Sequence, residues 1–179
     1  MSIEGGITGI FVYGLELNSD GSLGQGTKGR ALLALELHRY MPNSIIVAAA
    51  GISPDVPSQT VPMHTLIAEF LATYQVAPVY EIPAVTFDTL GERGAFLSLG
   101  VSREMHVTSW WHMPRVWLGR RSVKSLSPIR TIAYAAVWDR PTLRSAGLEV
   151  TKLCSILLLP KSLQNRVARL VKSRVRTSW

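Results

Sequence analysis

Short apolar runs alternate along the chain with longer segments whose apolar residues recur at helical spacing. Five runs have the length and β-branched content of buried strands: Ile7–Tyr13, Ser44–Ala50, Val79–Ile82, Met105–Thr108 and Arg130–Trp138. Helical spacing and capping signals predict helices over four segments between them: Arg30–Tyr40, Met63–Tyr74, Thr86–Leu99 and Met113–Arg121. This alternation of strand and helix predicts a parallel sheet with helices on both faces.

The predicted fold is a Rossmann-like three-layer α/β domain with right-handed crossovers. We expect five parallel strands in the order 3-2-1-4-5, so that the first strand is central. In this order the winding direction reverses between the first and fourth strands. Open α/β sheets bind ligands at such switch points, outside the carboxyl ends of the strands. The residues that follow the first and fourth strands are therefore the first candidates for a site.

The stretch VTSWWHMPR (Val107–Arg115), at the end of the fourth predicted strand, holds the most closely spaced set of side chains that could bind a ligand. Thr108 and Ser109 end the strand, and His112 and Arg115 follow on one face of the first helical turn. Two hydroxyls, an imidazole, a guanidinium and the free N–H groups of a helix start suit a phosphate or carboxylate ligand. His112 could also act as a general acid–base. The alternative is a surface turn whose two tryptophans pack against the sheet.

The glycine-rich segment Gly21–Arg30, after the first strand, is a second candidate. Its glycines would let the backbone approach a phosphate, and Lys28 and Arg30 supply positive charge. It matches neither the dinucleotide-binding pattern nor the P-loop, so a solvent-exposed loop is the alternative. If the switch-point interpretation holds, Gly14, Arg30 and Gly51 converge with the residues of the VTSWWHMPR stretch on one cleft.

Asp88 has two interpretations. It could orient a substrate or hold His112, which makes these two the candidate catalytic residues. It could instead cap the third predicted helix together with Thr86, because Thr and Asp side chains accept bonds from free N–H groups. The sequence leaves the catalytic residues, and whether the chain is an enzyme, unassigned.

Several kinds of site are disfavoured. No serine lies in a G-x-S-x-G elbow, which argues against a triad hydrolase of the α/β type. The single Cys154 excludes an internal disulfide and a cysteine-based zinc site. The four histidines form no H-E-x-x-H pair, so no tightly bound transition metal is predicted. Among them, His64 is expected on a helix surface, and His38 and His106 are expected to be structural or exposed.

Positive charge is concentrated at the end of the chain. The net charge is +7, and residues 151–179 hold seven Lys/Arg and no Asp/Glu, whereas residues 1–150 hold twelve of each. We therefore expect one α/β domain over 1–150 and a basic helical extension of it over 151–179. The extension could pack on the core or lie against an anionic membrane. Because the charge is confined to this segment, nucleic acid is a disfavoured partner for the domain. The oligomeric state is open.

The sequence shows no targeting or membrane-spanning segment. Its start has no basic region followed by an apolar stretch, so no signal peptide is predicted. The late apolar run Ile156–Leu159 is far shorter than the ~20 residues that span a bilayer. The expected location is the cytoplasm, with peripheral membrane contact through the basic extension.

The chain also resembles a bacterial family. VTSWWHMPR resembles the VTS-x-x-H-x-x-R signature of the YdcF/SanA/ElyC-like proteins. Weaker matches follow the family order over roughly residues 7–120 and lie at Tyr13–Gly14, Asp20–Leu23, Arg30, Ala50–Gly51 and Thr86–Thr89. The resemblance implies a Rossmann-like fold and a role in cell-envelope metabolism. S-adenosylmethionine, a nucleotide or a lipid-carrier phosphate are the ligands that it implies.

Three parts of the chain depart from the family pattern. Pro62–His64 replaces the S-E-A that opens the second helix, so its Glu is missing. Asp88 and Thr89 replace the Glu and Asn of T-x-E-N, and the glycine turn after the second strand is reduced to Ala49–Gly51. If those polar groups serve catalysis in the family, this chain has altered or lost chemistry. The alternative function is therefore a catalytically decayed interaction or oligomerisation module.

Overall fold

The structure is a computed structural model that describes residues 6–14, 16–52, 59–75, 79–82, 96, 99, 101–114, 131–138 and 143–158. Its elements, in chain order, are β1 (Thr8–Val12), α1 (Gln25–Tyr40), β2 (Ser44–Ala48), α2 (Met63–Ala72), β3 (Tyr80–Glu81), β4 (Arg103–Ser109), β5 (Thr131–Val137) and α5 (Leu143–Leu158). The helices predicted over Thr86–Leu99 and Met113–Arg121 lie mostly outside the described residues.

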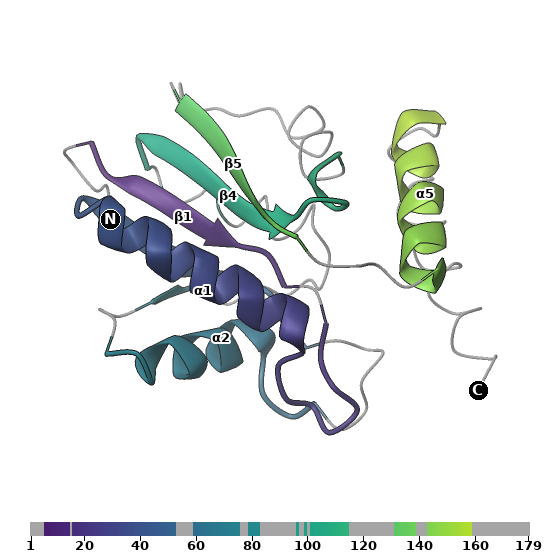
Figure 1. The fold of residues 1–179 in the computed structure, drawn as a ribbon, viewed down its shortest axis with the longest axis horizontal. Helices are drawn as coiled ribbons and strands as arrows, with labels where there is room; N and C mark the ends of the chain where they lie inside the picture. Colours follow the sequence, from purple (N-terminus) through teal and green to yellow (C-terminus); the bar gives the residue numbers. More distant parts are fainter. Residues whose placement is uncertain are drawn as a thin grey trace.

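The five strands form one parallel sheet in the order β3-β2-β1-β4-β5. The predicted Rossmann-like α/β fold and its strand order are confirmed. Val12 of β1 lies opposite Val107 of β4, and Ser109 of β4 lies opposite Val137 of β5. The carboxyl ends of these three strands therefore lie along one edge of the sheet, with the switch point between β1 and β4 (Figure 1).

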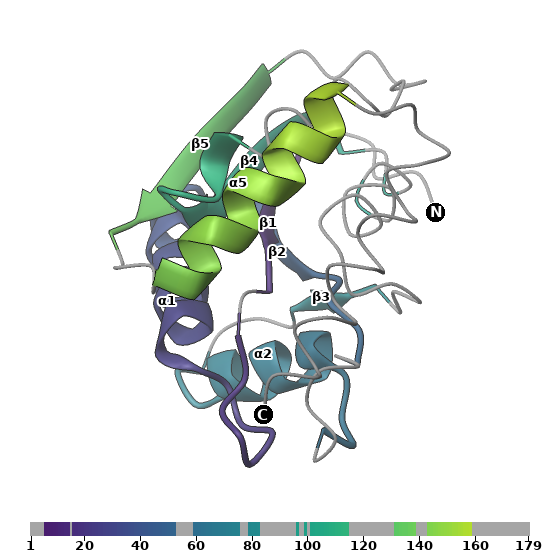
Figure 2. The same ribbon diagram turned by 90° about the vertical axis from the view of Figure 1, so that its right-hand side faces the viewer.

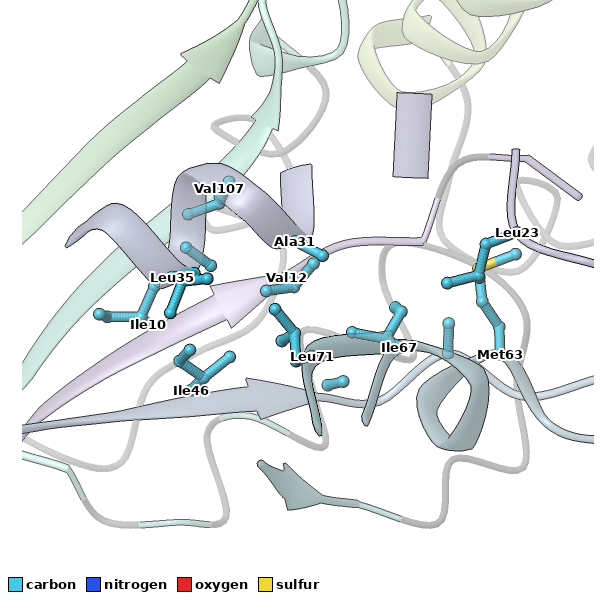
Figure 3. Packing of buried hydrophobic residues seen from close by; sticks show 13 residues of the cluster. Ile10, Val12, Leu23, Ala31, Leu35, Ile46, Met63, Ile67, Leu71 and Val107 are labelled. Carbon is cyan, nitrogen blue, oxygen red and sulfur yellow. The ribbon is translucent and has the colours of Figure 1, made fainter. Parts of the chain in front are cut away.

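Helices α1 and α2 cover one face of the sheet (Figure 1). Figure 3 shows Ile10 and Val12 of β1 directed toward Leu35 of α1 and Ile67 and Leu71 of α2. All five side chains are buried. Because strands of a parallel sheet are buried on both faces, their sequences are continuous apolar runs rather than alternating ones.

The other face of the sheet holds a second, aromatic cluster. Phe11 and Tyr13 of β1 point to this side, as successive side chains of a strand must alternate. Phe96, from the predicted third helix, stacks on Phe11 with ring centroids 4.3 Å apart and meets Tyr13 edge to face at 5.3 Å. The predicted third helix thus supplies at least one residue to the layer that covers this face.

Helix α1 begins at Gln25, five residues earlier than the predicted start at Arg30. Lys28 therefore lies in the first turn of a helix and not in a loop. The early start has a physical cause in Glu16, whose carboxylate accepts a bond from the Gly26 N–H at 2.9 Å. Thr27 hydroxyl and the Glu16 backbone exchange two further bonds. This cap comes from a distant residue, so local capping rules miss it.

Helix α5 begins at Leu143, before the boundary at 150/151 that was predicted for the basic extension. Figures 1 and 2 place it beyond the carboxyl ends of β1, β4 and β5, apart from α1 and α2. Val150, Leu157 and Leu158 on this helix are exposed. None of the described helices is long and apolar enough to cross a membrane. Residues 159–179 lie outside the described part of the chain, so their membrane contact stays a prediction.

Candidate functional site

Arg30 is the centre of a buried polar cluster at the switch point. It projects from α1 with 1% of its surface exposed. Its Nη1 donates to the carbonyl oxygens of Tyr13 at 3.0 Å and Gly14 at 3.2 Å. Its Nε and Nη2 donate to Ser109 Oγ at 3.1 and 2.7 Å, and Nη2 also donates to His112 Nδ1 at 2.6 Å. These bonds account for the five N–H groups of a guanidinium, which here ties the end of β1 to the end of β4.

The bond from Arg30 fixes the role of each nitrogen of His112. A guanidinium has only donors, so His112 Nδ1 must accept, and a neutral imidazole then carries its proton on Nε2. Trp111 stacks on the imidazole with ring centroids 3.8 Å apart, which holds the ring plane. In this arrangement Nε2 is the donor atom of the neutral His112 ring, and Nδ1 is the acceptor. The geometry favours an electrostatic role over a general base.

Gly14 allows β1 and α2 to approach closely. A Cβ at this position would lie 2.8 Å from Ala50 Cβ and closer still to Met63 Sδ. Met63 opens α2 and is fully buried. The thioether of Met63 therefore fills the space beside Gly14. The role of Gly14 that the structure displays is close packing, together with its carbonyl bond to Arg30.

Replacing Gly14 with alanine is expected to lower the free energy of unfolding by about 1–3 kcal/mol, because the new Cβ would meet the Met63 thioether and the Ala50 methyl group, and both side chains are fully buried. Gly147→Ala is the matched control. A Cβ at Gly147 meets nothing within 4 Å and the residue lies within α5, so this change should be neutral or slightly stabilising. Urea denaturation of both variants measures the difference, and equal midpoints would contradict the packing role.

Gly51 lies at the start of α2 rather than at the Arg30 cluster. Its carbonyl accepts the Met63 N–H at 3.1 Å, and the Ala50 carbonyl accepts the His64 N–H at 2.7 Å. The expectation that His64 lies on a helix surface is wrong. Its side chain is buried, bonds to the Ala50 carbonyl through Nδ1 at 2.9 Å and lies 3.8 Å from a Glu81 oxygen through Nε2. Pro62 offers no side-chain cap, so backbone carbonyls accept the hydrogen bonds of the first N–H groups of α2.

The glycine-rich segment is organised around Glu16 rather than around an open cradle. The Gly26 N–H that a phosphate would use already bonds to the Glu16 carboxylate. A Cβ at Gly24 would overlap the Glu16 side chain. Lys28 lies near Asp20, and the bonds from the Ser22 backbone N–H and hydroxyl lower the pKa of that carboxyl, with a smaller contribution from the Lys28 charge.

A second polar cluster lies on the opposite face of the sheet. His106 Nε2 donates to Glu104 Oε2 at 2.9 Å, and His106 Nδ1 bonds to the Tyr13 hydroxyl at 3.1 Å. All three side chains are at most 2% exposed. Thr108 follows two residues later on the same face as His106, so it points away from Ser109, and its buried hydroxyl has no hydrogen-bond partner among the described residues.

The structure brings together four of the predicted site residues: Gly14, Arg30, Ser109 and His112. Thr108, Gly51 and Lys28 lie elsewhere, as described above. The remaining three predicted residues, Thr86, Asp88 and Arg115, lie outside the described residues.

Sequence reasoning missed Glu16, Tyr13 and Glu104. The signal for Glu104 was available: Glu104 and His106 are two residues apart in one strand, which places both side chains on the same face of the sheet. In the part of the chain that the structure describes, no group of three or more His, Cys, Asp or Glu side chains is placed to hold a metal ion.

Comparisons with protein-family models, with curated proteins and with solved structures gave no match. The resemblance to the YdcF/SanA/ElyC-like family therefore stays a prediction that rests on the residues quoted for it.

Proposed function

We propose that the chain binds a small molecule bearing a phosphate or carboxylate at the carboxyl ends of β1 and β4. The observation that carries this proposal is the position of Arg30, whose guanidinium joins Tyr13 and Gly14 to Ser109 and His112 at the switch point. Ligands of open α/β sheets bind at this point of the fold. A buried guanidinium also raises the local potential for an anion.

The proposal gives each residue a distinct role. The N–H groups of Arg30 donate hydrogen bonds to protein acceptors. Arg30 therefore contributes charge and positions Ser109 and His112 rather than contacting the ligand. His112 donates from Nε2 to the anion. Arg115, which the sequence predicts on the same helical face as His112, is a second cationic contact. No reaction is assigned, because these groups recognise negative charge without supplying a nucleophile or a base.

The resemblance supplies the ligand classes for the first test: nucleotides, S-adenosylmethionine and lipid-carrier phosphates such as prenyl phosphates, in a setting of cell-envelope metabolism. A ligand at a hundredfold excess over its Kd stabilises the folded state by about 2.7 kcal/mol. For a domain of this size that raises Tm by several degrees, at roughly 2–4 °C per kcal/mol. At least one phosphate-bearing class is expected to produce such a shift.

The matched variants are His112→Ala and His38→Ala. His112→Ala should lose most of the ligand-induced Tm shift. His38 lies at the far end of α1, bonded to Ser44 at 2.9 Å, so His38→Ala should keep the shift even if its own Tm is lower. The absence of a shift with every ligand class, or an unchanged shift in His112→Ala, would refute the proposal.

The alternative function, an interaction or oligomerisation module, has specific support of its own. Buried Met63 stands where the family pattern has a carboxylate, and the apolar Leu157 and Leu158 of α5 are exposed. Trp and apolar side chains of this kind are frequent interface anchors. A stable oligomer in multi-angle light scattering would support this function, whereas a monodisperse monomer at high concentration would exclude it.

A further inference from the structure

Two exposed tryptophans stack on one another at the carboxyl ends of β4 and β5. The indole rings of Trp110 and Trp138 have centroids 5.0 Å apart and planes 18° from parallel. Trp138 is 80% exposed and Trp110 is 41% exposed. Indole is the largest aromatic side chain, so two exposed indoles leave a large apolar surface area in contact with water. A stacked, exposed pair of this kind is a surface suited to another flat ring.

The pair belongs to the same edge of the sheet as the proposed anion site. Trp110 directly follows Ser109, whose hydroxyl accepts two bonds from Arg30. The backbone N–H of Trp110 donates to the Val137 carbonyl at 3.2 Å, and Trp138 directly follows Val137. Both indoles therefore lie at the carboxyl ends of β4 and β5. Trp110 is the residue directly after Ser109, at the edge of the sheet where the anion site is proposed.

We propose that Trp110 and Trp138 form a ring-stacking subsite, and that the ligand is a nucleotide, in which a planar base is joined through a sugar to the phosphate. This inference rests on the proposed anion site and extends it by naming the other end of the ligand. The two indoles already stack on each other, so the base adds to the outer face of Trp138 and does not enter between them. The phosphate then reaches back toward Ser109 and His112.

The position of the pair favours a ligand ring over a protein partner. The pair lies at the carboxyl ends of β4 and β5, and ligands of open α/β sheets bind outside the carboxyl ends of the strands. Among the described residues, the polar Ser109 and the cluster around Arg30 lie at the same edge. A ligand with one flat apolar end and one charged end matches this neighbouring arrangement. Base stacking on an aromatic side chain changes affinity by about five- to a hundredfold.

Isothermal titration calorimetry of the full chain tests the inference with the mononucleotides of adenine, guanine, cytosine and uracil, and with ribose 5-phosphate and inorganic phosphate. At least one mononucleotide should bind about tenfold more tightly than ribose 5-phosphate. Trp138→Ala should remove this preference while leaving the affinity for ribose 5-phosphate unchanged. Trp138→Phe should retain most of it, because a phenyl ring still stacks.

Tyr40→Ala is the matched control, since Tyr40 is 82% exposed and lies at the opposite end of α1. It should leave every affinity unchanged. Equal affinities for ribose 5-phosphate and all four mononucleotides would overturn the ring subsite and leave the anion site standing. Failure of every one of these compounds to bind the unaltered chain would overturn the nucleotide assignment, and the anion site would fall with it if no ligand class shifts Tm either. A change of mass in light scattering for Trp138→Ala, without a change in nucleotide preference, would assign the pair to a protein interface instead.

Discussion

Replacing Arg30 with alanine is expected to lower the free energy of unfolding by about 3–5 kcal/mol. The change removes the buried stem of a side chain that is 1% exposed and leaves a cavity. It also strands the acceptors that the guanidinium serves, including the Tyr13 and Gly14 carbonyls and His112 Nδ1. Each buried group that loses its bond costs about 1–3 kcal/mol. Since a whole domain is stable by only about 5–15 kcal/mol, the variant should be marginal at 37 °C.

Two further variants test whether the loss of stability comes from the hydrogen bonds of the buried guanidinium. Arg30→Lys keeps the charge but offers a point donor in place of the planar fork, so it should recover less than half of the loss. Arg39→Ala, on the same helix, removes an exposed arginine that forms a 2.7 Å ion pair with the exposed Glu36, and should change stability by less than about 0.5 kcal/mol. Chemical denaturation followed by circular dichroism measures all three. A loss below 1 kcal/mol for Arg30→Ala would show that the cluster does not hold β1 and β4 together.

The fold was predictable because burial on both faces leaves a strong pattern. Strands β1 and β2 are covered on each side, so they stand out as continuous apolar runs between helical segments. The alternation of strands and helices along the chain, together with the right-handed crossover rule, leaves few possible strand orders. The observed order is the one in which the first strand is central. The boundaries of the helices were less predictable. The start of α1 depends on a hydrogen bond to Glu16, which lies too far from the helix start in the chain for the usual capping patterns to include it.

The candidate site was predictable only in part. Arg30, Ser109 and His112 could be brought together from the sequence because the switch point names the two strands whose ends meet. Thr108 was grouped with Ser109 although adjacent strand residues face opposite sides, so the alternation rule would have separated them. The bond between Tyr13 and His106 joins residues 93 apart, and no local pattern predicts such a pair.

Tyr13 connects the two polar clusters across the sheet. Its backbone carbonyl accepts from Arg30 on the helix-covered face, while its hydroxyl bonds to His106 on the aromatic face. The position of β1 relative to β4 is thus fixed from both sides at the same residue. This arrangement explains why a polar network is kept in a core that could otherwise be filled by apolar side chains, because polar networks specify one packing where apolar contacts allow several.

The buried pair of Glu104 and His106 should be strongly coupled. His106→Leu removes the bond that reaches Glu104 Oε2 at 2.9 Å, and both side chains are at most 2% exposed. Removing one partner of a buried pair costs about 3–5 kcal/mol, whereas replacing both by apolar residues of similar size is often neutral. The double variant Glu104→Leu/His106→Leu is therefore expected to lose less than the sum of the single variants. We expect a coupling of about 1–3 kcal/mol.

This double-mutant cycle is best run in a Tyr13→Phe background, so that no hydroxyl is left buried without its His106 bond. The control is the Glu36–Arg39 pair, which has a contact of 2.7 Å but side chains that are 52% and 56% exposed. Its coupling should be about 0.2–0.5 kcal/mol, because water screens an exposed pair and side-chain entropy opposes it. The two pairs differ mainly in burial, so the comparison isolates that factor. Equal coupling energies for the buried and the exposed pair would mean that the Tyr13–His106–Glu104 cluster fills space without specifying how β1 and β4 pack.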